Sequence, residues 1–444
     1  MPTQKQILAS IDARLALVPQ IAADLKTLLG PPPVVEQPPA VEPPDEPPVV
    51  VDPPAPIPAG GMSAAQMIAA KLVMPFSRAN VVNGGSLPSY WIGDSWSSVG
   101  LASDMGATGE RQEIGVETDA IADFLMGGSS NNMIAQATAH KDVPVHFLAD
   151  DGYLPNAIRD PQATCDYRAV DGGWTPFYPI MESPITPEWA HYPSVSYVPF
   201  LHTGDRKYLP ELQHAANFMI INAPPDFRAP ARINDIQHRG LAWGLREVAK
   251  AYIATKIAEA GGTLPKPFHP SSYWRTVLTN IRTRMEGQWL NSTSTLVKNT
   301  HMWPSGEPFA GCIAPWQHDY ISMVLGWMIY TGQFEDFRPL YNFQVQQAII
   351  RASGPLRSRA IGYELESNGA SDWPGVLNLN GMGTPTSDGN FPDTVKNQHP
   401  HYAGLLRASL KLAVLNNVTG SQPAYDYADA QAKRVGLISL RHAV

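Results

Sequence analysis

The sequence contains few cysteines and few charged residues. Two cysteines among 444 residues, Cys165 and Cys312, are too few for a disulfide framework or a zinc cluster, and free thiols are favoured over a disulfide. Charged residues make up 16% of the chain and the net charge is -8. No excess of Lys and Arg is therefore present to neutralise phosphates, and we expect no nucleic-acid partner.

Long apolar runs are also missing. A membrane-spanning helix needs roughly 18 apolar residues in succession. The sequence has no such run, and residues 1–20 lack the unbroken apolar core of a signal peptide. We expect no membrane span, and synthesis in a reducing cytoplasm.

Residues 1–29 carry apolar side chains in a heptad pattern. These positions follow one another in alternating steps of three and four residues: Leu8, Ile11, Leu15, Val18, Ala22, Leu25 and Leu29. Such a seam predicts a helix that packs against a partner helix, although Pro19 kinks or divides it. We interpret residues 1–29 as an attachment segment, which either forms a homo-oligomer or lies on a larger assembly.

Residues 30–61 form a proline-rich, acidic segment with no basic residue. Proline lacks the backbone N–H that a helix or a central strand requires. The segment is therefore expected to be an extended polyproline-like spacer, with a rise of about 3.1 Å per residue. Ala59, Gly60 and Gly61 at its end predict a swivel.

Residues 62–444 form the third and largest part. They begin with strand-like and turn-like sequence, including Asn83-Gly84, which predicts a small β-rich lead-in. Helical patterns follow. Three segments share a His-Tyr or His-Asp-Tyr opening, an apolar helix, a Thr-Gly stop and a return helix, and they open at His191, His318 and His401.

The glycines of the Thr-Gly stops lie where the end of a helix favours a left-handed residue. They are Gly204, Gly332 and Gly420. Two looser units begin near Gly115 and Ile236, so the sequence predicts five or six helical hairpins.

This pattern resembles the six-hairpin glycosidase-like group, which includes polysaccharide lyases and glycosidases. The motifs that carry the resemblance are Leu201-His202-Thr203-Gly204-Asp205, Arg239-Gly240-Leu241-Ala242-Trp243 and Ala314-Pro315-Trp316-Gln317-His318-Asp319-Tyr320. The resemblance covers residues 110–435. It implies a mainly α fold, an α/α toroid with an inner and an outer ring of helices. An open α-solenoid is the alternative.

In a toroid the N-terminal ends of the inner helices meet at one mouth, where free N–H groups favour an anionic or hydroxyl-rich ligand. The residues at these openings are His191, Tyr192, Gln237, His238, Arg239, Trp316, Gln317, His318, Asp319, His399, His401 and Tyr402. We expect a ligand site there. A structural role in helix packing is the alternative for the repeated His-Tyr openings.

A second group of residues shares one face of a predicted helix. Arg239, Trp243, Arg246 and Lys250 follow one another in steps of four, three and four. A cationic face could hold an acidic glycan. A solvated or ion-paired face is the alternative, and it is favoured for Arg246 and Lys250.

Uronate β-elimination is one mechanism that fits these residues. It needs a base, a group that stabilises the developing charge, and an acid for the leaving oxygen. The residues assigned to these roles are His191 or His238 as base, Tyr192 or Tyr197 as acid, and Arg239 with Gln237 as carboxylate clamp. The toroid lyases carry an Asn-His pair, and this sequence has none.

Glycoside hydrolysis is the other mechanism, and it needs two carboxylates on either side of the scissile bond. Asp319 is the best-placed carboxylate. Its possible partners are Asp205, Asp235, Glu364 and Asp372. No phosphate-binding loop, metalloprotease helix or serine-hydrolase motif occurs, so we predict no cofactor and no metal.

The three parts together describe a globular head on a spacer with an attachment helix. This layout resembles phage surface fibres, tail appendages and capsid decorations. It implies a virion-displayed protein that binds, and by one of the two mechanisms cleaves, host surface polysaccharide. The alternatives are a non-catalytic structural protein that mediates adhesion and a glycosidase of the bacterial cytoplasm.

Overall fold

The structure is a computed structural model, and it divides the chain into two units, residues 1–50 and 51–444. All described residues belong to the second unit. They are residues 57–58, 60–84, 114–140, 148–149, 151–164, 192–222, 231–233, 238–262, 264, 266–291, 312–353, 365–366, 399–436 and 438–444. The heptad segment 1–29 and residues 30–56 of the spacer lie outside this set, so the expectations for them stay predictions.

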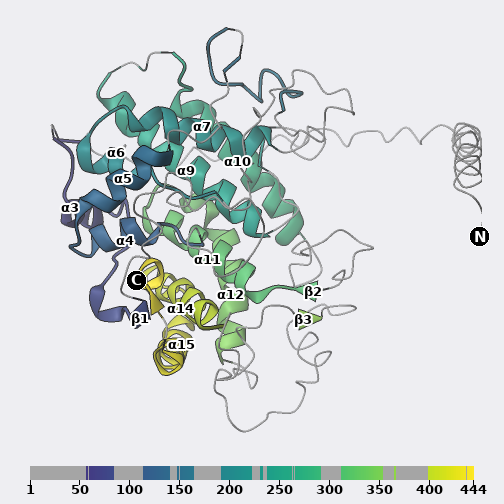
Figure 1. Ribbon diagram of the computed structural model, residues 1–444. Coiled ribbons are helices and arrows are strands. Elements are labelled where there is room, and N and C mark those ends of the chain that lie inside the picture. Colours follow the sequence, from purple (N-terminus) through teal and green to yellow (C-terminus); the bar gives the residue numbers. More distant parts are fainter. Residues whose placement is uncertain are drawn as a thin grey trace, which may run out of the picture. The chain divides into compact units, whose positions relative to one another are not determined.

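The described part of the chain is mainly helical, which confirms the expected mainly α class (Figure 1). Its longer helices occur in consecutive pairs whose members contact each other. The pairs are α4 (Asp119–Leu125) with α5 (Ser130–His140), α6 (Tyr197–Thr203) with α7 (Tyr208–Ile221), α9 (His238–Ala260) with α10 (Ser271–Trp289), α11 (Pro315–Tyr330) with α12 (Arg338–Ser353), and α14 (His399–Leu415) with α15 (Ser421–Val435).

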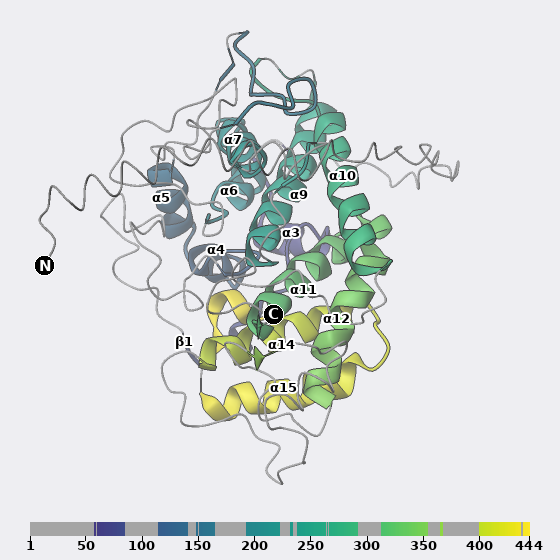
Figure 2. The same ribbon diagram turned by 90° about the vertical axis from the view of Figure 1, so that its right-hand side faces the viewer.

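The first helices of successive pairs also pack on one another. Helix α9 contacts α6 on one side and α11 on the other, and α11 contacts α14. The two views in Figures 1 and 2 show α11 in the interior, with α12 and α15 at the edge. All residues of α11 except Tyr330 are buried. A helix that is apolar and buried all round belongs in the core of a fold.

The ends of these helices follow the predicted glycine pattern in two of three places. Gly204 caps α6 with a φ of 66°, and Gly332 follows α11 with a φ of 71°. At the end of α14, however, Asn417 takes the left-handed conformation with a φ of 57°. Gly420 is also left-handed, but it is the residue that precedes α15. Asn tolerates this region better than most residues, which explains the exchange of roles.

Two short strand pairs accompany the helices in the described residues. Strand β1 (Asn83–Gly84) pairs in parallel with β4 (Ile438–Ser439), and β2 (Cys312–Ile313) pairs antiparallel with β3 (Leu365–Glu366). The described residues of the lead-in therefore contribute one strand. The Asn-Gly signal does not mark a hairpin turn, because its two residues pair with the far end of the chain.

Residues 77–84 and 438–444 are hydrogen-bonded to each other, and we call these two segments together the clasp. The Ser77 N–H donates to the Ala443 carbonyl at 2.8 Å, and Asn80 Nδ2 donates to the Val444 O at 3.0 Å. The 3₁₀ turn η8 (Leu440–His442) within the clasp contacts both α4 and α14. The clasp thus joins the first helical pair to the last.

The end of the proline-rich segment is fixed to α6. The Met62 N–H donates to the Leu201 carbonyl at 2.9 Å, and His202 Nδ1 lies 3.1 Å from the Met62 carbonyl oxygen. A Cβ built on Gly61 would lie 1.7 Å from the His202 carbonyl oxygen. The predicted swivel is therefore wrong at Gly61, because the backbone there is packed against the helix. Ala59 lies outside the described residues.

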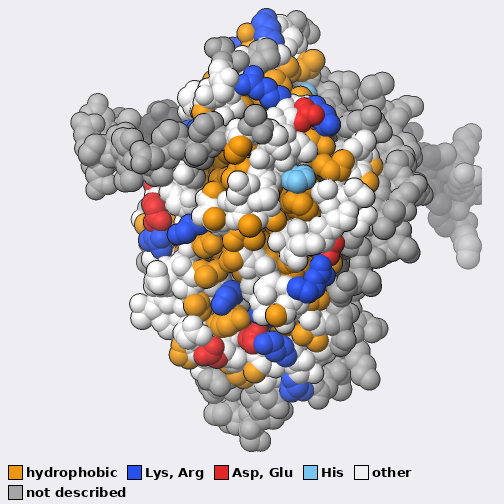
Figure 3. All heavy atoms as spheres, turned by 90° about the vertical axis from the view of Figure 1, so that its left-hand side faces the viewer, with side chains coloured by type: hydrophobic (Ala, Val, Ile, Leu, Met, Phe, Trp, Pro, Cys, Tyr) orange, Lys and Arg blue, Asp and Glu red, His pale blue; other side chains and the backbone are white. Residues whose placement is uncertain are grey.

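The face that carries helix α3 (Ala64–Ala69) is shown in Figure 3. Hydrophobic side chains form an irregular band on it, with Lys and Arg side chains at intervals and fewer Asp and Glu. No helix in the described part of the chain has both the length and the apolar character needed to cross a bilayer.

Candidate functional site

The structure brings together the first turns of α9 and α11. The imidazole rings of His238 and His318 lie 4.7 Å apart, and His238 also lies 5.2 Å from the Trp289 ring on α10. Pro315 begins α11, where its missing N–H is not needed and its fixed φ favours the helix. The predicted convergence of residues that are 80 positions apart in the sequence is therefore present for this pair.

Both histidines are buried and uncharged at neutral pH. Burial lowers the pKa of His238 to about 3, against a smaller opposing effect of Gln344. Burial also lowers the pKa of His318 well below its usual value, and His238 and Arg351 add to that shift. Gln344 Nε2 donates to His318 Nδ1 at 3.1 Å, so the neutral ring carries its proton on Nε2.

The side-chain amide of Gln317 connects α11 to the first turn of α9. Its Oε1 accepts the Arg239 backbone N–H at 3.3 Å. Gln317 Nε2 is buried and has no hydrogen-bond partner among the described residues, whereas the His238 ring has the Gln344 side chain as a hydrogen-bond partner. Buried polar atoms are rarely left unpaired, so such atoms point to a site that accepts a ligand or a water molecule.

Aromatic rings lie beside this polar group. Trp316 stacks on Tyr402 of α14 with ring centroids 5.9 Å apart and an interplanar angle of 15°. Trp243 meets Tyr320 edge-on at 4.9 Å. All four rings are almost completely buried. The contacts of His318 and Trp316 thus bring the first turn of α11 against the starts of both α9 and α14.

Asp319 is held by an arginine from the neighbouring helix. It forms a buried ion pair with Arg351 near the end of α12. Burial raises the pKa of Asp319, and Arg351 opposes that shift. Its suggested partner Asp205 lies beyond the C-terminal end of α6, where it binds Lys207 at 3.0 Å. The other suggested carboxylates, Asp235, Glu364 and Asp372, lie outside the described residues.

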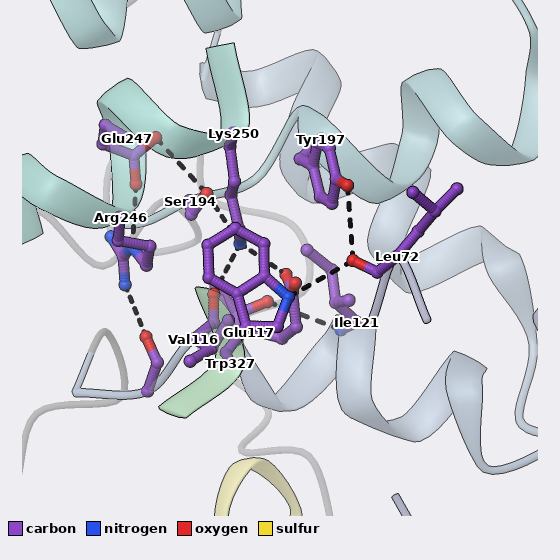
Figure 4. A network of polar contacts seen from close by, with 12 residues as sticks. Leu72, Val116, Glu117, Ile121, Ser194, Tyr197, Arg246, Glu247, Lys250 and Trp327 are labelled. Atoms are coloured by element: carbon purple, nitrogen blue, oxygen red, sulfur yellow. Dashed lines mark hydrogen bonds and ion pairs between the residues drawn. The ribbon is translucent and has the colours of Figure 1, made fainter. Parts of the chain in front are cut away.

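Arg246 and Lys250 take part in an internal polar network (Figure 4). Lys250 Nζ lies 2.9 Å from Glu117 Oε2 and 3.0 Å from Ser194 Oγ, and Arg246 Nε lies 2.8 Å from Glu247 Oε1. All four charged side chains are at most 2% exposed. The ion-paired alternative is therefore confirmed for these two cations, and neither faces an open lumen.

The network also holds the lead-in segment. Tyr197 Oη donates to the Leu72 carbonyl at 3.3 Å, and Trp327 Nε1 donates to the same oxygen at 3.2 Å. Lys250 Nζ lies 5.3 Å from the Tyr197 ring centroid and 5.6 Å from that of Trp327. These contacts give the network a structural role, because they fix Leu72 between α6 and α11.

The two tyrosines predicted as acids are both buried. Burial raises the pKa of Tyr192 and of Tyr197 well above the usual value of a phenol. The Tyr192 backbone carbonyl accepts from Arg246 Nη2, and Tyr197 Oη is used by Leu72. Neither side chain is thus arranged as an accessible proton donor.

Some predicted residues fall beyond what the structure describes. They are His191, Gln237 and the attachment residues Leu8, Ile11, Leu15, Val18 and Leu25, together with the side chains of His399 and His401. The predictions for them stay predictions.

Sequence reasoning missed the polar residues of α12 that reach this site. Gln344, Gln347 and Arg351 are all buried and follow one another in steps of three and four, so they lie on one face of the helix. Gln344 binds His318 and Arg351 binds Asp319. The spacing of these three polar residues along one face of α12 was the signal that could have revealed them.

No group of three or more His, Cys, Asp and Glu side chains in the described ranges is placed to hold a metal ion. Comparisons of the chain with protein families, curated proteins and solved structures found no match.

Proposed function

We propose that the helical pairs form an α/α toroid and that the first turns of α9, α11 and α14 form its glycan-binding face. The toroid is supported by the succession of contacts from α6 through α9 and α11 to α14. The clasp supports closure of the ring, since η8 contacts both α14 and α4. An open solenoid would leave its first and last pairs apart.

The observation that carries the binding proposal is the group around His238. The buried Gln317 Nε2 atom has no partner among the described residues. It lies in the first turn of α11 next to Trp316, which stacks on Tyr402, while His238 packs against Trp289. Convergent polar groups within an apolar, aromatic environment are typical of sites that bind small ligands and sugars.

The same geometry favours binding over cleavage. An effective general base has a pKa near the working pH. The His238 pKa of about 3 is far from this range, and the Asp319 carboxylate is already bound to Arg351. We therefore propose an adhesion protein whose toroid recognises polysaccharide and leaves it intact.

We further propose that this head is displayed from a virion or another large assembly. The support is the order of parts in the sequence: the heptad segment 1–29, the proline-rich spacer 30–61 and then the helical domain. A stiff spacer separates a binding head from its point of attachment. Removal of residues 1–29 should release the head from its assembly and leave its glycan affinity unchanged.

Affinity electrophoresis of the full chain through gels that contain single bacterial polysaccharides tests the binding proposal. Unsaturated-uronate absorbance and reducing ends are followed in parallel. We expect retardation by at least one polysaccharide without either product signal. Gln317→Ala, which removes the amide N–H group without a described partner, should abolish retardation, whereas Arg282→Ala, at a half-buried side chain of α10, should not.

Three results would contradict this proposal. The first is that no polysaccharide changes the mobility of the protein. The second is that Gln317→Ala is retarded as strongly as the unsubstituted protein, and the third is that reducing ends are released. The last would show that the domain is a glycan-cleaving enzyme and would direct attention to the residues outside the described ranges.

A further inference from the structure

The ammonium group of Lys250 is surrounded by three oxygen atoms. Its Nζ lies 2.5 Å from the Val116 carbonyl oxygen, 2.9 Å from Glu117 Oε2 and 3.0 Å from Ser194 Oγ. An ammonium has three hydrogens, so each of these oxygens accepts one of them. When the hydrogen shared with Glu117 moves onto that carboxylate, the other two still bind Val116 and Ser194. The lone pair of the resulting amine is then directed at the Glu117 carboxyl group.

The surroundings of the pair favour this transfer. The side chains of Lys250 and Glu117 are both 0% exposed, and the rings of Tyr197 and Trp327 lie 5.3 and 5.6 Å from Nζ. Burial raises the pKa of Glu117, and Lys250 opposes that shift. Burial lowers the pKa of Lys250, and Glu117 opposes that shift. Both shifts are towards the uncharged acid and the uncharged amine, and the uncharged amine is the nucleophilic form of lysine.

A second carboxylate is connected to the same amine through a serine. Ser194 Oγ accepts from Lys250 Nζ and donates to Glu247 Oε2 at 3.3 Å. The other oxygen of Glu247 accepts from Arg246 Nε at 2.8 Å, which holds the carboxylate in place. A proton can therefore pass from Nζ through Ser194 to Glu247 and back again.

We propose that Lys250 and Glu117 condense to an amide, which is an intramolecular cross-link between α9 and the segment that precedes α4. Lys250 Nζ forms a bond to the carboxyl carbon of Glu117, and one proton passes from Nζ through Ser194 to Glu247. That proton then joins the departing hydroxyl group of Glu117. The carbon–oxygen bond breaks, one water molecule leaves, and no other reactant is consumed.

The cross-link would replace two buried charges with one uncharged group. A buried ion pair adds little net stability, because each charge has lost its water. The amide also joins residues 133 positions apart, and a covalent link of this length restricts the unfolded chain. The linked segment binds the clasp as well, since Ile114 and Asp119 both accept from Arg441.

Intact-mass spectrometry of the full chain in denaturant tests the proposal. We expect a mass that is lower than that of the unreacted sequence by one water molecule. Trypsin does not cleave after an acylated lysine, so peptides 112–141 and 247–256 should appear as one branched species. Lys207 and Asp205 are the internal control, because they lie 3.0 Å apart on the exposed surface, and cleavage after Lys207 should be normal.

Two variants separate the cross-link from the ion pair. Lys250→Arg keeps the charge opposite Glu117 and removes the nucleophilic amine, so its mass should equal that of its own sequence. Ser194→Ala keeps both reacting groups and removes the proton relay. Newly synthesised Ser194→Ala should lose the water about a hundredfold more slowly than the unsubstituted chain. Circular dichroism confirms that each variant folds.

The unsubstituted chain decides the proposal even where a variant does not fold. A mass equal to that of the unreacted sequence, with ordinary cleavage after Lys250, would overturn it. Loss of water at any other pair of residues would overturn the assignment to Lys250 and Glu117. A cross-link that forms as fast in Ser194→Ala would overturn the relay through Ser194 and leave the cross-link itself in place.

Discussion

At the scale of single residues, several arginines form ion pairs with carboxylates in the interior of the fold. Arg351 pairs with Asp319, Arg441 with Asp119 and Arg246 with Glu247, all with side chains that are 8% exposed or less. Such pairs add little net stability, because each charge has lost its water. The loss of one partner is costly, however, since it leaves the other charge buried.

Asp319→Asn should therefore lower the free energy of unfolding by about 3 to 5 kcal/mol. Asp205→Asn is the matched control, because Asp205 and Lys207 are 42% and 64% exposed and such surface pairs contribute less than about 1 kcal/mol. Urea unfolding followed by tryptophan fluorescence gives both values. Equal small effects of the two substitutions would contradict the burial of the Asp319–Arg351 pair.

The neutral histidines make stability depend on pH. The unfolded chain binds a proton on His238 near pH 6.5, whereas the folded chain does so at about 3. Between these values the unfolded state binds more protons, so stability falls as the pH is lowered through 6.5. Arg351 acts in the same direction on His318.

The contribution of His238 alone should be a loss of about 1.4 kcal/mol between pH 7.5 and pH 5.5. Urea midpoints at the two pH values measure it. The variant His238→Phe keeps a ring against Trp289 and cannot titrate, so its pH dependence should be smaller by this amount. An unchanged pH dependence would mean that His238 is charged or exposed in the folded chain.

The residues of the site could be located in the sequence, but their partners could not. The His openings and helix starts predicted that His238 and His318 meet, as they do at 4.7 Å. The role of Arg351 was missed, because a helical repeat shows which face is buried and not which residue of another helix lies opposite. For the same reason, Asp319 was predicted as a catalytic carboxylate, and its ion pair with Arg351 was not anticipated.

At the scale of elements, helix ends were the most predictable feature. Left-handed glycines at Gly204 and Gly332 follow from the local chain alone, since a helix stop depends on a few neighbouring residues. Asn417, and not Gly420, is the left-handed residue that follows the end of α14, because both Asn and Gly tolerate the left-handed conformation. The end of the spacer was wrongly predicted, as its packing depends on the distant residue His202.

Gly60 and Gly61 provide a matched pair for that packing. Both have positive φ, but a Cβ on Gly60 would meet nothing within 4 Å. Gly60→Ala should cost about 1 to 2 kcal/mol from backbone strain alone. Gly61→Ala should cost that and about 1 kcal/mol more, because the clash with His202 breaks the hydrogen bond from Met62 to Leu201.

Chemical unfolding of the two variants measures the difference. Hydrogen exchange at the Met62 amide gives a local check, with faster exchange expected in Gly61→Ala alone. Equal costs for the two variants would show that the spacer is not fixed to α6.

At the scale of the whole molecule, the clasp joins parts of the chain that no local pattern connects. Asn80 and Val444 are 364 positions apart, and Asp119 binds both the backbone and the side chain of Arg441. The fold class could be predicted from the periodicity of each helix. The clasp could not, because its strands have two residues each and carry no repeat.

Deletion of residues 438–444 should open the clasp and expose the first helical pair. Hydrogen exchange followed by mass spectrometry should show loss of protection in residues 72–84 and 114–125, while α10 changes least. Asp119→Asn is a milder variant that should give the same order with smaller effects. Uniform loss of protection along the chain would show that the clasp stabilises the whole fold and not this joint.

The clasp also determines when the domain can be completed during its synthesis. Ribosomes add about 5 to 20 residues per second, so roughly 20 to 70 seconds pass between the synthesis of residue 80 and that of residue 444. The intermediate helical pairs can assemble in that time, while Val73 and Met74 beside the clasp still lack their final neighbours. Translation speed and chaperone access should thus influence how much correctly closed protein a cell obtains.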